Sequence, residues 1–226
     1  MKKIFGHRGL PNSYPENTFL SLNKALEICD FVETDVRITK DQELILFHDP
    51  TLNNQKIEEL SLQEISDIKN TDLNENHLIS RDQILGNVNF ELKVNKEQEN
   101  LNTIFVEKII EITNPEDIVS SFDWGTILSN REKFNSRYGI LIDEENQLFE
   151  SKAISNLDDN LMFMIQKDIF HSRKFDLPKD KCVVWTVNDK DEIDNILNTG
   201  VYGVVTDIGD KPVSYTHLTL PTTVQV

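Results

Sequence analysis

Residues 31–49 read FVETDVRITKDQELILFHD. Two short apolar runs in this stretch, Phe31–Val36 and Leu44–Phe47, are typical of strands, and each carries acidic or histidine side chains at or near its end. The same pattern recurs in two other segments: Lys3–Phe5 followed by His7-Arg8-Gly9, and Val88–Leu92 with Glu91 and the following Lys93. Polar groups at successive strand ends are what a barrel enzyme needs at the mouth of its sheet. The sequence therefore predicts catalysis at one end of a sheet.

Strand-like and helix-like stretches alternate along the rest of the chain. The later strands are expected at Asp117–Phe122, Tyr138–Ile142, Leu161–Ile165, Lys181–Val187 and Val201–Thr206. Helices are expected from Pro15-Glu16-Asn17-Thr18 onward, and at Ser61–Ile68, Glu97–Ile112, Trp124–Glu132, Glu144–Ala153 and Lys190–Asn198. Parallel strands joined by helices favour right-handed crossovers, and eight such units close a barrel. We therefore predict a compact α/β protein with the TIM (β/α)8 barrel fold.

A doubly wound open sheet is the alternative architecture for this alternation. Its phosphate-binding turn carries the pattern Gly-x-Gly-x-x-Gly. The turn Gly6-His7-Arg8-Gly9 lacks the third glycine and puts large side chains where a pyrophosphate would lie. The barrel is therefore favoured.

The composition narrows the classes of protein. The chain has 226 residues, of which 38% are hydrophobic and 27% charged, as in an ordinary soluble globular protein. A formal net charge of −16 argues against a nucleic-acid or anionic-membrane surface, because long-range repulsion opposes both. No stretch resembles a secretory signal or a membrane span, so we expect a cytoplasmic protein without stable membrane association. Cys29 and Cys182 match no zinc pattern and are expected to be reduced, buried thiols.

Residues 213–226 read VSYTHLTLPTTVQV. This segment is rich in threonine, has no amphipathic helical period, and resembles the translation of a sequencing adapter. We therefore expect a barrel over residues 1–212 that ends near Lys211 or Pro212, and a non-native tail over residues 213–226. A covering helix should follow the last strand, and this tail is a poor candidate for it.

Three carboxylates are the candidate metal ligands. Glu33 and Asp35 lie two apart on one strand, so their side chains project on the same face, and Glu91 repeats the pattern on the next barrel strand. Taken singly, each of these acids is more typical of a surface ion pair. Together they predict a site of hard oxygen ligands suited to Mg²⁺ or Ca²⁺.

Two histidines and two cations complete the set. His7 and His48 are the candidate acid and base, since an imidazole can gain or lose a proton near neutral pH. Arg8 offers a planar fork for two anionic oxygens, and Lys93 offers a point charge. Both cations would offset the negative charge of a site with three carboxylates.

The motifs in their order resemble those of the glycerophosphodiester phosphodiesterase family. They are Gly6-His7-Arg8-Gly9, Pro15-Glu16-Asn17-Thr18, Glu33-Thr34-Asp35-Val36, Thr39-Lys40-Asp41, His48-Asp49 with Thr51-Leu52, and Glu91-Leu92-Lys93. Ser121-Phe122, Trp185-Thr186-Val187-Asn188 and Gly203-Val204-Val205-Thr206-Asp207 look like its later strands. Each motif is weak alone, but six in order over roughly residues 3–210 make a specific signal.

The resemblance implies a TIM barrel that hydrolyses glycerophosphodiesters to glycerol 3-phosphate and an alcohol. It assigns the divalent cation to Glu33, Asp35 and Glu91, the acid–base pair to His7 and His48, and the phosphate to Arg8 and Lys93. Phe122 and Trp185 resemble aromatic positions that wall the glycerol end of the substrate, although plain core packing would explain them as well.

Two departures from the family pattern bear on specificity. Only about forty residues separate His48-Asp49 from the strand of Glu91, where the family has a larger insertion, so the substrate cap is expected to be small or open. The turn Lys40-Asp41-Gln42-Glu43 lacks the usual glycine, which we interpret as a tolerated variant.

Two other functions remain open at this stage. A phospholipase D-like enzyme or an inositol-phospholipid lyase of the same superfamily would use a similar histidine pair. Such an enzyme needs an apolar rim to bind lipid, and the short insertion offers few residues for one. An inactive metal- or anion-binding barrel is the other alternative, and the complete set of residues argues against it. A small-molecule glycerophosphodiester is the expected partner, and the oligomeric state is left open.

Overall fold

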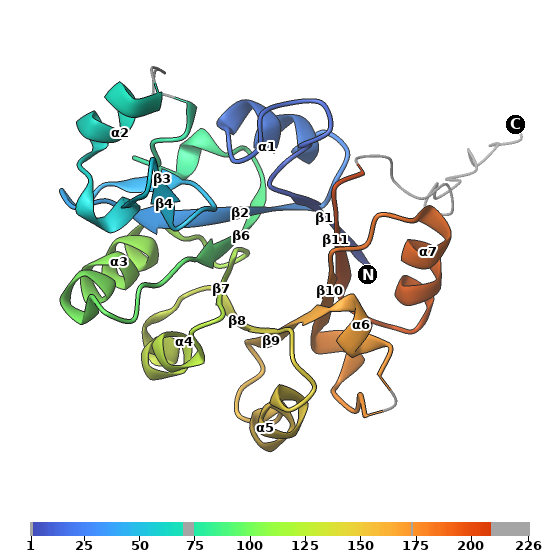
Figure 1. The fold of residues 1–226 in the computed structure, drawn as a ribbon. Helices are drawn as coiled ribbons and strands as arrows, with labels where there is room; N and C mark the ends of the chain where they lie inside the picture. The colour runs from blue at the N-terminus through green and yellow to red at the C-terminus, as the bar shows by residue number, and fades with distance from the viewer. Residues whose placement is uncertain (1, 70–74, 173, 209–226) are drawn as a thin grey trace, which may run out of the picture.

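The computed structural model describes residues 2–69, 75–172 and 174–208, in which eight parallel strands close into a barrel. The strands follow the order β1-β11-β10-β9-β8-β7-β6-β2, and β2 pairs with β1 to complete the ring. Figure 1 looks into this ring, with the helices around its outside. The predicted TIM barrel is confirmed and the open sheet is wrong. The tail predicted for residues 213–226 and the expected covering helix lie outside the described residues.

The barrel strands are β1 (Lys3–His7), β2 (Phe31–Ile38), β6 (Asn87–Leu92), β7 (Ile118–Ser121), β8 (Arg137–Ile142), β9 (Leu161–Gln166), β10 (Cys182–Trp185) and β11 (Gly203–Thr206). The α-helices are α1 (Phe19–Leu26), α2 (Leu62–Lys69), α3 (Glu99–Ile112), α4 (Trp124–Asn130), α5 (Gln147–Ile154), α6 (Lys167–Phe170) and α7 (Lys190–Asn198). Short 3-10 turns are η1 (Ile57–Glu59), η3 (Arg81–Gln83), η4 (Arg131–Lys133) and η5 (Lys179–Lys181). The one-turn helix α6 was not predicted, because four residues are too few to show a helical period.

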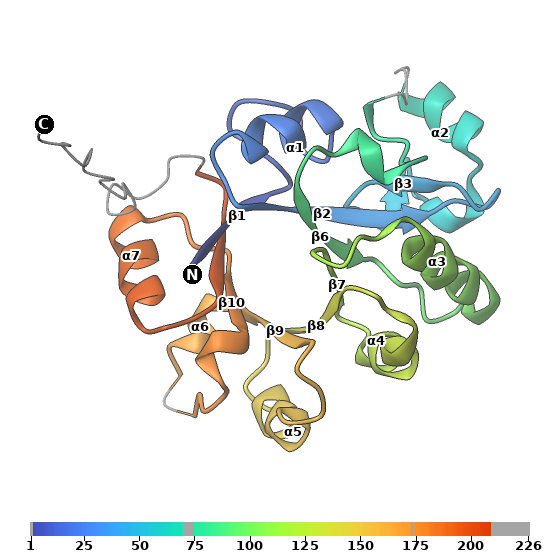
Figure 2. The same ribbon diagram turned by 180° about the vertical axis from the view of Figure 1, so that it is seen from behind.

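The segment between β2 and β6 differs from the other βα units. Strand β3 (Leu44–Leu46) pairs antiparallel with the end of β2 and stands outside the closed ring. A two-stranded hairpin, β4 (Thr51–Leu52) with β5 (Gln55–Lys56), and then η1 and α2 follow it. Figure 2, from the opposite side, shows α2 beside β3 and away from the ring. The turn η3 and an isolated bridge between His77 and Ile45 complete the described part of this segment.

Alternation along the strands separates two cores. Residues of one strand face pack with helix residues such as Leu22 and Phe105, whereas Phe5, Phe31, Val183 and their neighbours form a separate cluster. Because strand side chains alternate, this second cluster lies inside the barrel. The rings of Phe5 and Phe31 stack at 4.6 Å between centroids. An apolar plug therefore fills the barrel beneath the carboxyl ends of β1 and β2.

Both cysteines, Cys29 and Cys182, are buried and unbridged, as predicted. Among the described residues, no helix combines the length and the apolar content that crossing a bilayer demands.

The loop between β1 and α1 is fixed at both ends. Thr18 caps α1, its hydroxyl accepting from the Ser21 backbone N–H at 3.2 Å. Gly9 has a φ of +91°, and a Cβ there would lie 2.3 Å from Ser21 Oγ and 2.6 Å from the Ser21 carbonyl carbon. Only glycine fits this approach of the loop to the helix.

We expect Gly9→Ala to lower the free energy of unfolding by about 3 kcal/mol, since backbone strain and a collision with the helix backbone add together. Gly200 is the matched control, because its φ is +96° and a Cβ would meet nothing within 4 Å. Gly200→Ala should therefore cost only the strain of about 1 kcal/mol. Urea unfolding of both variants measures the difference, and equal losses would contradict the close approach at Gly9.

Candidate active site

Strand register brings the predicted site residues together at the carboxyl ends of β1, β2 and β6. His7 on β1 pairs in register with Glu33 on β2, and Asp35 pairs with Glu91 on β6. These positions lie on the inward face, two and four residues beyond the apolar plug at Phe5 and Phe31. The alternation that builds the core therefore also aims the polar side chains into the mouth of the barrel.

Glu33, Asp35 and Glu91 form one acidic cluster, with a ligand oxygen from each lying within 4.8 Å of the other two. Lys93 Nζ lies 2.9 Å from Asp35 Oδ1 and also pairs with Glu91. Arg8 approaches from the β1–α1 loop, with Nε 3.0 Å from Asp35 Oδ2 and its backbone N–H donating to Glu33 Oε2 at 3.1 Å. Each carboxylate thus has at least one positive or donor group beside it.

Asn17 orients Asp35, a role that the sequence analysis missed. Its Nδ2 donates to Asp35 Oδ2 at 2.9 Å, while its Oδ1 accepts from Thr34 Oγ1 at 2.8 Å and from the Asp35 backbone N–H at 3.1 Å. Asn17 is 3% exposed and adopts a φ of +54°. The Pro15-Glu16-Asn17-Thr18 motif signalled a helix start, but only the fold shows that its asparagine reaches across to β2.

His7 is held by a residue that the sequence analysis also missed. Its Nδ1 lies 2.6 Å from Asp207 Oδ1, just beyond β11, and its Nε2 lies 3.9 Å from Glu33 Oε2. Asn188 donates to the other oxygen of Asp207 at 2.5 Å. The Thr206-Asp207 ending of the last strand was the available signal. Asp207 therefore leaves Nε2 of His7 directed toward the acidic cluster.

His48 lies at the rim rather than in the interior. Its side chain is 38% exposed, and Nδ1 lies 2.9 Å from Asp49 Oδ1, whose side chain is 69% exposed. Burial raises the pKa of Glu91, and it outweighs the charges of Lys93 and His48, which lower that pKa. The two predicted acid–base histidines thus occupy different environments: His7 is partly buried against Asp207, whereas His48 is exposed.

The carboxylates divide into two electrostatic classes. Burial, reinforced by the charge of Asp35, raises the pKa of Glu33 to about 8. The pKa of Asp35 is lowered, because Lys93, Arg8 and Asn17 together outweigh its burial. The pKa of Lys93 is raised, since Glu91 and Asp35 outweigh its burial. Without further positive charge, the cluster favours a protonated Glu33 beside an ionised Asp35.

The residues present fit a hard divalent cation. Glu33 Oε1 is buried and has no hydrogen-bond partner, so one oxygen of the cluster is left for another ligand. A cavity of about 30 Å³ adjoins it, lined by His7, Glu33, Glu91 and Trp185 among others. Three convergent carboxylates match the oxygen ligands that Mg²⁺ and Ca²⁺ take. This part of the structure can therefore hold a divalent cation.

The two aromatic residues lie together beside Lys93. The rings of Phe122 and Trp185 meet edge to face at 5.8 Å, and Lys93 Nζ lies 5.8 Å from the centre of the Phe122 ring. Phe122 is 41% exposed, so core packing does not explain it. Trp185 lines the cavity, and its buried Nε1 has no hydrogen-bond partner. Trp185 therefore borders the cavity beside the acidic cluster, and Phe122 borders an adjoining hollow beside Lys93.

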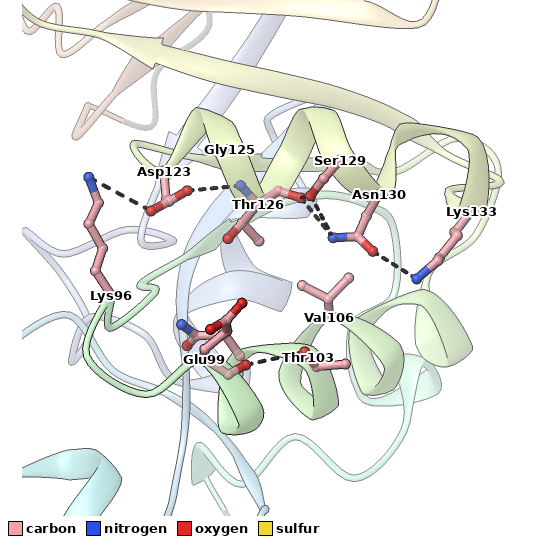
Figure 3. A pocket seen from close by; sticks show the side chains of 11 residues that line it. Lys96, Glu99, Thr103, Val106, Asp123, Gly125, Thr126, Ser129, Asn130 and Lys133 are labelled. Atoms are coloured by element: carbon pink, nitrogen blue, oxygen red, sulfur yellow. Dashed lines mark hydrogen bonds and ion pairs between the residues drawn. The ribbon is translucent and has the colours of Figure 1, made fainter.

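A hollow larger than the cavity beside Glu33 lies away from the predicted site residues. A groove of about 420 Å³ lies between α3 and α4 (Figure 3). Its polar side chains bond mainly to each other and to backbone: Asn130 Nδ2 donates to the Thr126 carbonyl at 2.9 Å, and Lys133 donates to Asn130 Oδ1 at 3.0 Å. None of the predicted site residues lines it.

Comparison with known proteins decides the family. The sequence model of the glycerophosphoryl diester phosphodiesterase family matches residues 7–211. This chain belongs to that family. A curated glycerophosphodiester phosphodiesterase of Bacillus altitudinis is 48% identical over 54 residues, a stretch that covers 24% of this chain and 22% of that relative.

Solved structures of the family share the fold. A glycerophosphodiester phosphodiesterase of Thermotoga maritima superposes with a TM-score of 0.70 at 24% identity, covering 93% of this chain and 96% of that one. An Oleispira antarctica phosphodiesterase, solved with the product sn-glycerol-3-phosphate, gives a TM-score of 0.71 at 20% identity and covers 92% and 93% of the two chains. At 20–24% identity, this structural similarity shows a shared barrel fold.

The raised pKa of Glu33 predicts that cation binding depends on pH. Below about pH 8 a proton occupies Glu33 in the ion-free protein and must leave when a cation binds. The apparent affinity for Mg²⁺ or Ca²⁺ should therefore rise by up to about tenfold for each pH unit up to about 8. Calorimetry in buffers of different ionisation enthalpy measures both the affinity and the proton released.

Glu33→Gln is the control for this titration. The variant should bind the cation more weakly, and its affinity should vary less with pH because the titrating carboxyl is gone. An affinity of the unaltered protein that stayed constant between about pH 6 and pH 8 would count against the protonated Glu33.

Proposed function

We propose that this protein hydrolyses glycerophosphodiesters to glycerol 3-phosphate and an alcohol, with Mg²⁺ or Ca²⁺ as cofactor. The observation that carries the proposal is the convergence of His7, the acidic cluster and Lys93 in one barrel mouth, with His48 at its rim. Family membership supports the same reaction class. The named relatives support it further, one as a glycerophosphodiester phosphodiesterase and one with glycerol 3-phosphate bound.

Glu33, Asp35 and Glu91 would hold the cation, as the free oxygen of Glu33 and the spacing of the three carboxylates support. When bound, a divalent cation supplies Lewis-acid polarisation of a phosphate oxygen. Its positive charge would also lower the pKa of Glu33, because it would offset the burial and the charge of Asp35 that raise that pKa.

Arg8 and Lys93 serve the phosphate in this proposal. Both already face Asp35, at 3.0 and 2.9 Å, so they stand at the edge of the acidic cluster where an anionic diester would arrive. Guanidinium and ammonium groups pair well with phosphate oxygens. They offset part of the negative charge of the acidic cluster in a chain whose net charge is −16.

The two histidines divide the proton transfers. His7 acts as base: Asp207 fixes its Nδ1, so that Nε2 faces the cluster and can take the proton of the attacking hydroxyl. His48 acts as acid, because its place at the exposed rim lets it protonate the departing alkoxide as the alcohol leaves toward solvent. The nucleophile is water, or a hydroxyl of the glycerol itself, in which case a cyclic phosphate forms and water then opens it to glycerol 3-phosphate.

The substrate is a small polar diester rather than a lipid. Phe122 and Trp185 would wall the glycerol, since their rings border the space beside Lys93. A groove of about 520 Å³ lies beside the β4–β5 hairpin, and its exposed lining includes the charged side chains of Lys56, Lys96 and Glu97. An acyl chain bound in such a groove would lie against charged side chains instead of apolar ones, and it would displace water from them at a cost. This argues against the phospholipase D-like and lyase alternatives.

The activity should depend on the cation and on both histidines. Purified protein with Mg²⁺ or Ca²⁺ should release glycerol 3-phosphate from glycerophosphocholine, and chelation should abolish the release. His7→Ala and His48→Ala should each lower turnover by about 10²–10⁴-fold with cation binding retained. A coupled glycerol 3-phosphate assay measures this. Full activity after chelation would end the metal proposal, and no release from any of several head-group diesters would favour the inactive-barrel alternative.

The leaving group separates the two histidine roles. The para-nitrophenyl ester of glycerol phosphate releases a phenoxide that needs no proton from the enzyme. We expect the loss caused by His48→Ala to shrink by at least about tenfold on this ester, while the loss caused by His7→Ala stays the same. Turnover on this ester and on glycerophosphocholine gives the comparison. A loss that shrank for His7→Ala instead would reverse the assignment of acid and base.

A further inference from the structure

Arg37 lies next to the main chain of His48, at the place where hydrogen-bonded pairing with β2 ends. It lies two residues beyond Asp35 on β2, on the same face. Antiparallel pairing between β2 and β3 continues past β3 only as far as Phe47, whose N–H donates to the Asp35 carbonyl at 3.0 Å. His48 is the next residue. The main chain therefore leaves the sheet at His48, the residue that carries one of the two predicted acid–base side chains.

The guanidinium of Arg37 continues this support. Its Nε and Nη2 both donate to the His48 carbonyl, at 3.0 and 2.8 Å. Its Nη1 donates to Glu58 Oε1 at 3.0 Å. Two donors of one planar group on a single carbonyl fix both the distance and the direction of that carbonyl.

The pair of Arg37 and Glu58 is buried. Arg37 is 7% exposed and Glu58, from η1, is 6% exposed. Removing one partner of a buried pair leaves an uncompensated charge, so each holds the other in place. The β2 strand, the residue after Phe47 and the η1 turn are thus joined through one guanidinium.

The ring of His48 has weaker support than its backbone. Its hydrogen-bond partner is Asp49, a neighbour in sequence with an exposed carboxylate. A carboxylate in solvent restrains a ring much less than a buried fork restrains a carbonyl. The position of the imidazole therefore follows from the position of the His48 main chain.

We propose that Arg37 is a positioning residue for His48 and that Glu58 fixes Arg37 for this purpose. The proposal rests on the proposed function, in which His48 transfers a proton. Proton transfer requires hydrogen-bond contact with the reacting oxygen, and a displacement of about 1 Å can lower a rate by about 10²-fold. Arg37 does not touch substrate in this proposal, and acts only through the carbonyl that it holds.

The test compares Arg37→Lys in two backgrounds. Lysine keeps the charge but cannot donate twice to the His48 carbonyl while pairing with Glu58. In the unaltered protein, Arg37→Lys should lower kcat on glycerophosphocholine by about 10–100-fold with KM changed less than about threefold. In the His48→Ala background the same substitution should have no further effect beyond about threefold, because the group it positions is gone.

Two further variants bracket the effect. Glu58→Gln keeps Arg37 but removes the carboxylate that fixes it, so kcat should fall in the same direction by a smaller factor. Lys24→Met is the control: Lys24 forms an exposed ion pair with Glu27 at the end of α1 and lines none of the hollows described above. Its kcat should equal that of the unaltered protein. Thermal unfolding of each variant confirms that the protein compared is folded.

A purely structural role gives a different result. Arg37→Lys would then lower kcat by the same factor with or without His48, and this outcome would overturn the proposal, as would an unchanged kcat in the unaltered background. The imidazole signals of His48 in NMR spectra supply a readout that needs no activity. They should shift in Arg37→Lys and Glu58→Gln but not in Lys24→Met, and signals identical in all variants would also refute the positioning role.

The two proposals fail separately. Protein that releases no glycerol 3-phosphate from any diester contradicts the proposed function, whereas the NMR comparison still decides whether Arg37 holds His48. Protein that is active but shows independent, multiplying effects of Arg37→Lys and His48→Ala contradicts the positioning role alone.

Discussion

The mutual repulsion of three buried carboxylates is the constraint on which the rest of the site depends. Glu33, Asp35 and Glu91 are brought within 4.8 Å of one another by strand register, at positions between 1% and 8% exposed. Charges so placed repel strongly in a low-dielectric interior unless positive groups or protons offset them. The chain supplies Lys93 and Arg8, and Asn17 adds a neutral donor. These partners stabilise Asp35 as an anion, whereas burial and the charge of Asp35 leave Glu33 as a carboxyl that favours a proton.

The fold explains why this arrangement is compatible with a stable protein. The polar cluster lies above an apolar plug formed by residues on the same strand faces, so the strands are anchored by Phe5 and Phe31 below the point where they carry charge. The closed barrel fixes the separation of its strands, which prevents the carboxylates from moving apart to relieve their repulsion. Rigid strands therefore maintain an electrostatic strain that a loop would relax.

Local patterns in the sequence predicted the barrel and the inward acids, but not the partners that come from distant segments. Period-two spacing is enough to put Glu33 and Asp35 on one face, and a helix start is legible in Pro15-Glu16-Asn17-Thr18. That Asn17 crosses to Asp35, or that Asp207 reaches His7 from the other end of the chain, depends on closure of the barrel between β1 and β11. Contacts between residues so far apart in the sequence produce no periodic sequence pattern, so they can be identified only in the folded structure.

The asymmetry between the two histidines follows from the strands that carry them. His7 ends a central barrel strand, so a neighbouring strand end, at Asp207, can support its ring directly. His48 follows β3, which stands outside the ring, and its ring pairs with Asp49, its neighbour in sequence. The support of His48 instead acts on its main chain, through a guanidinium that is itself held by Glu58. In the proposed function, His48 at the rim would have access to the leaving alcohol, and its geometry would depend on the buried pair of Arg37 and Glu58 rather than on the sheet.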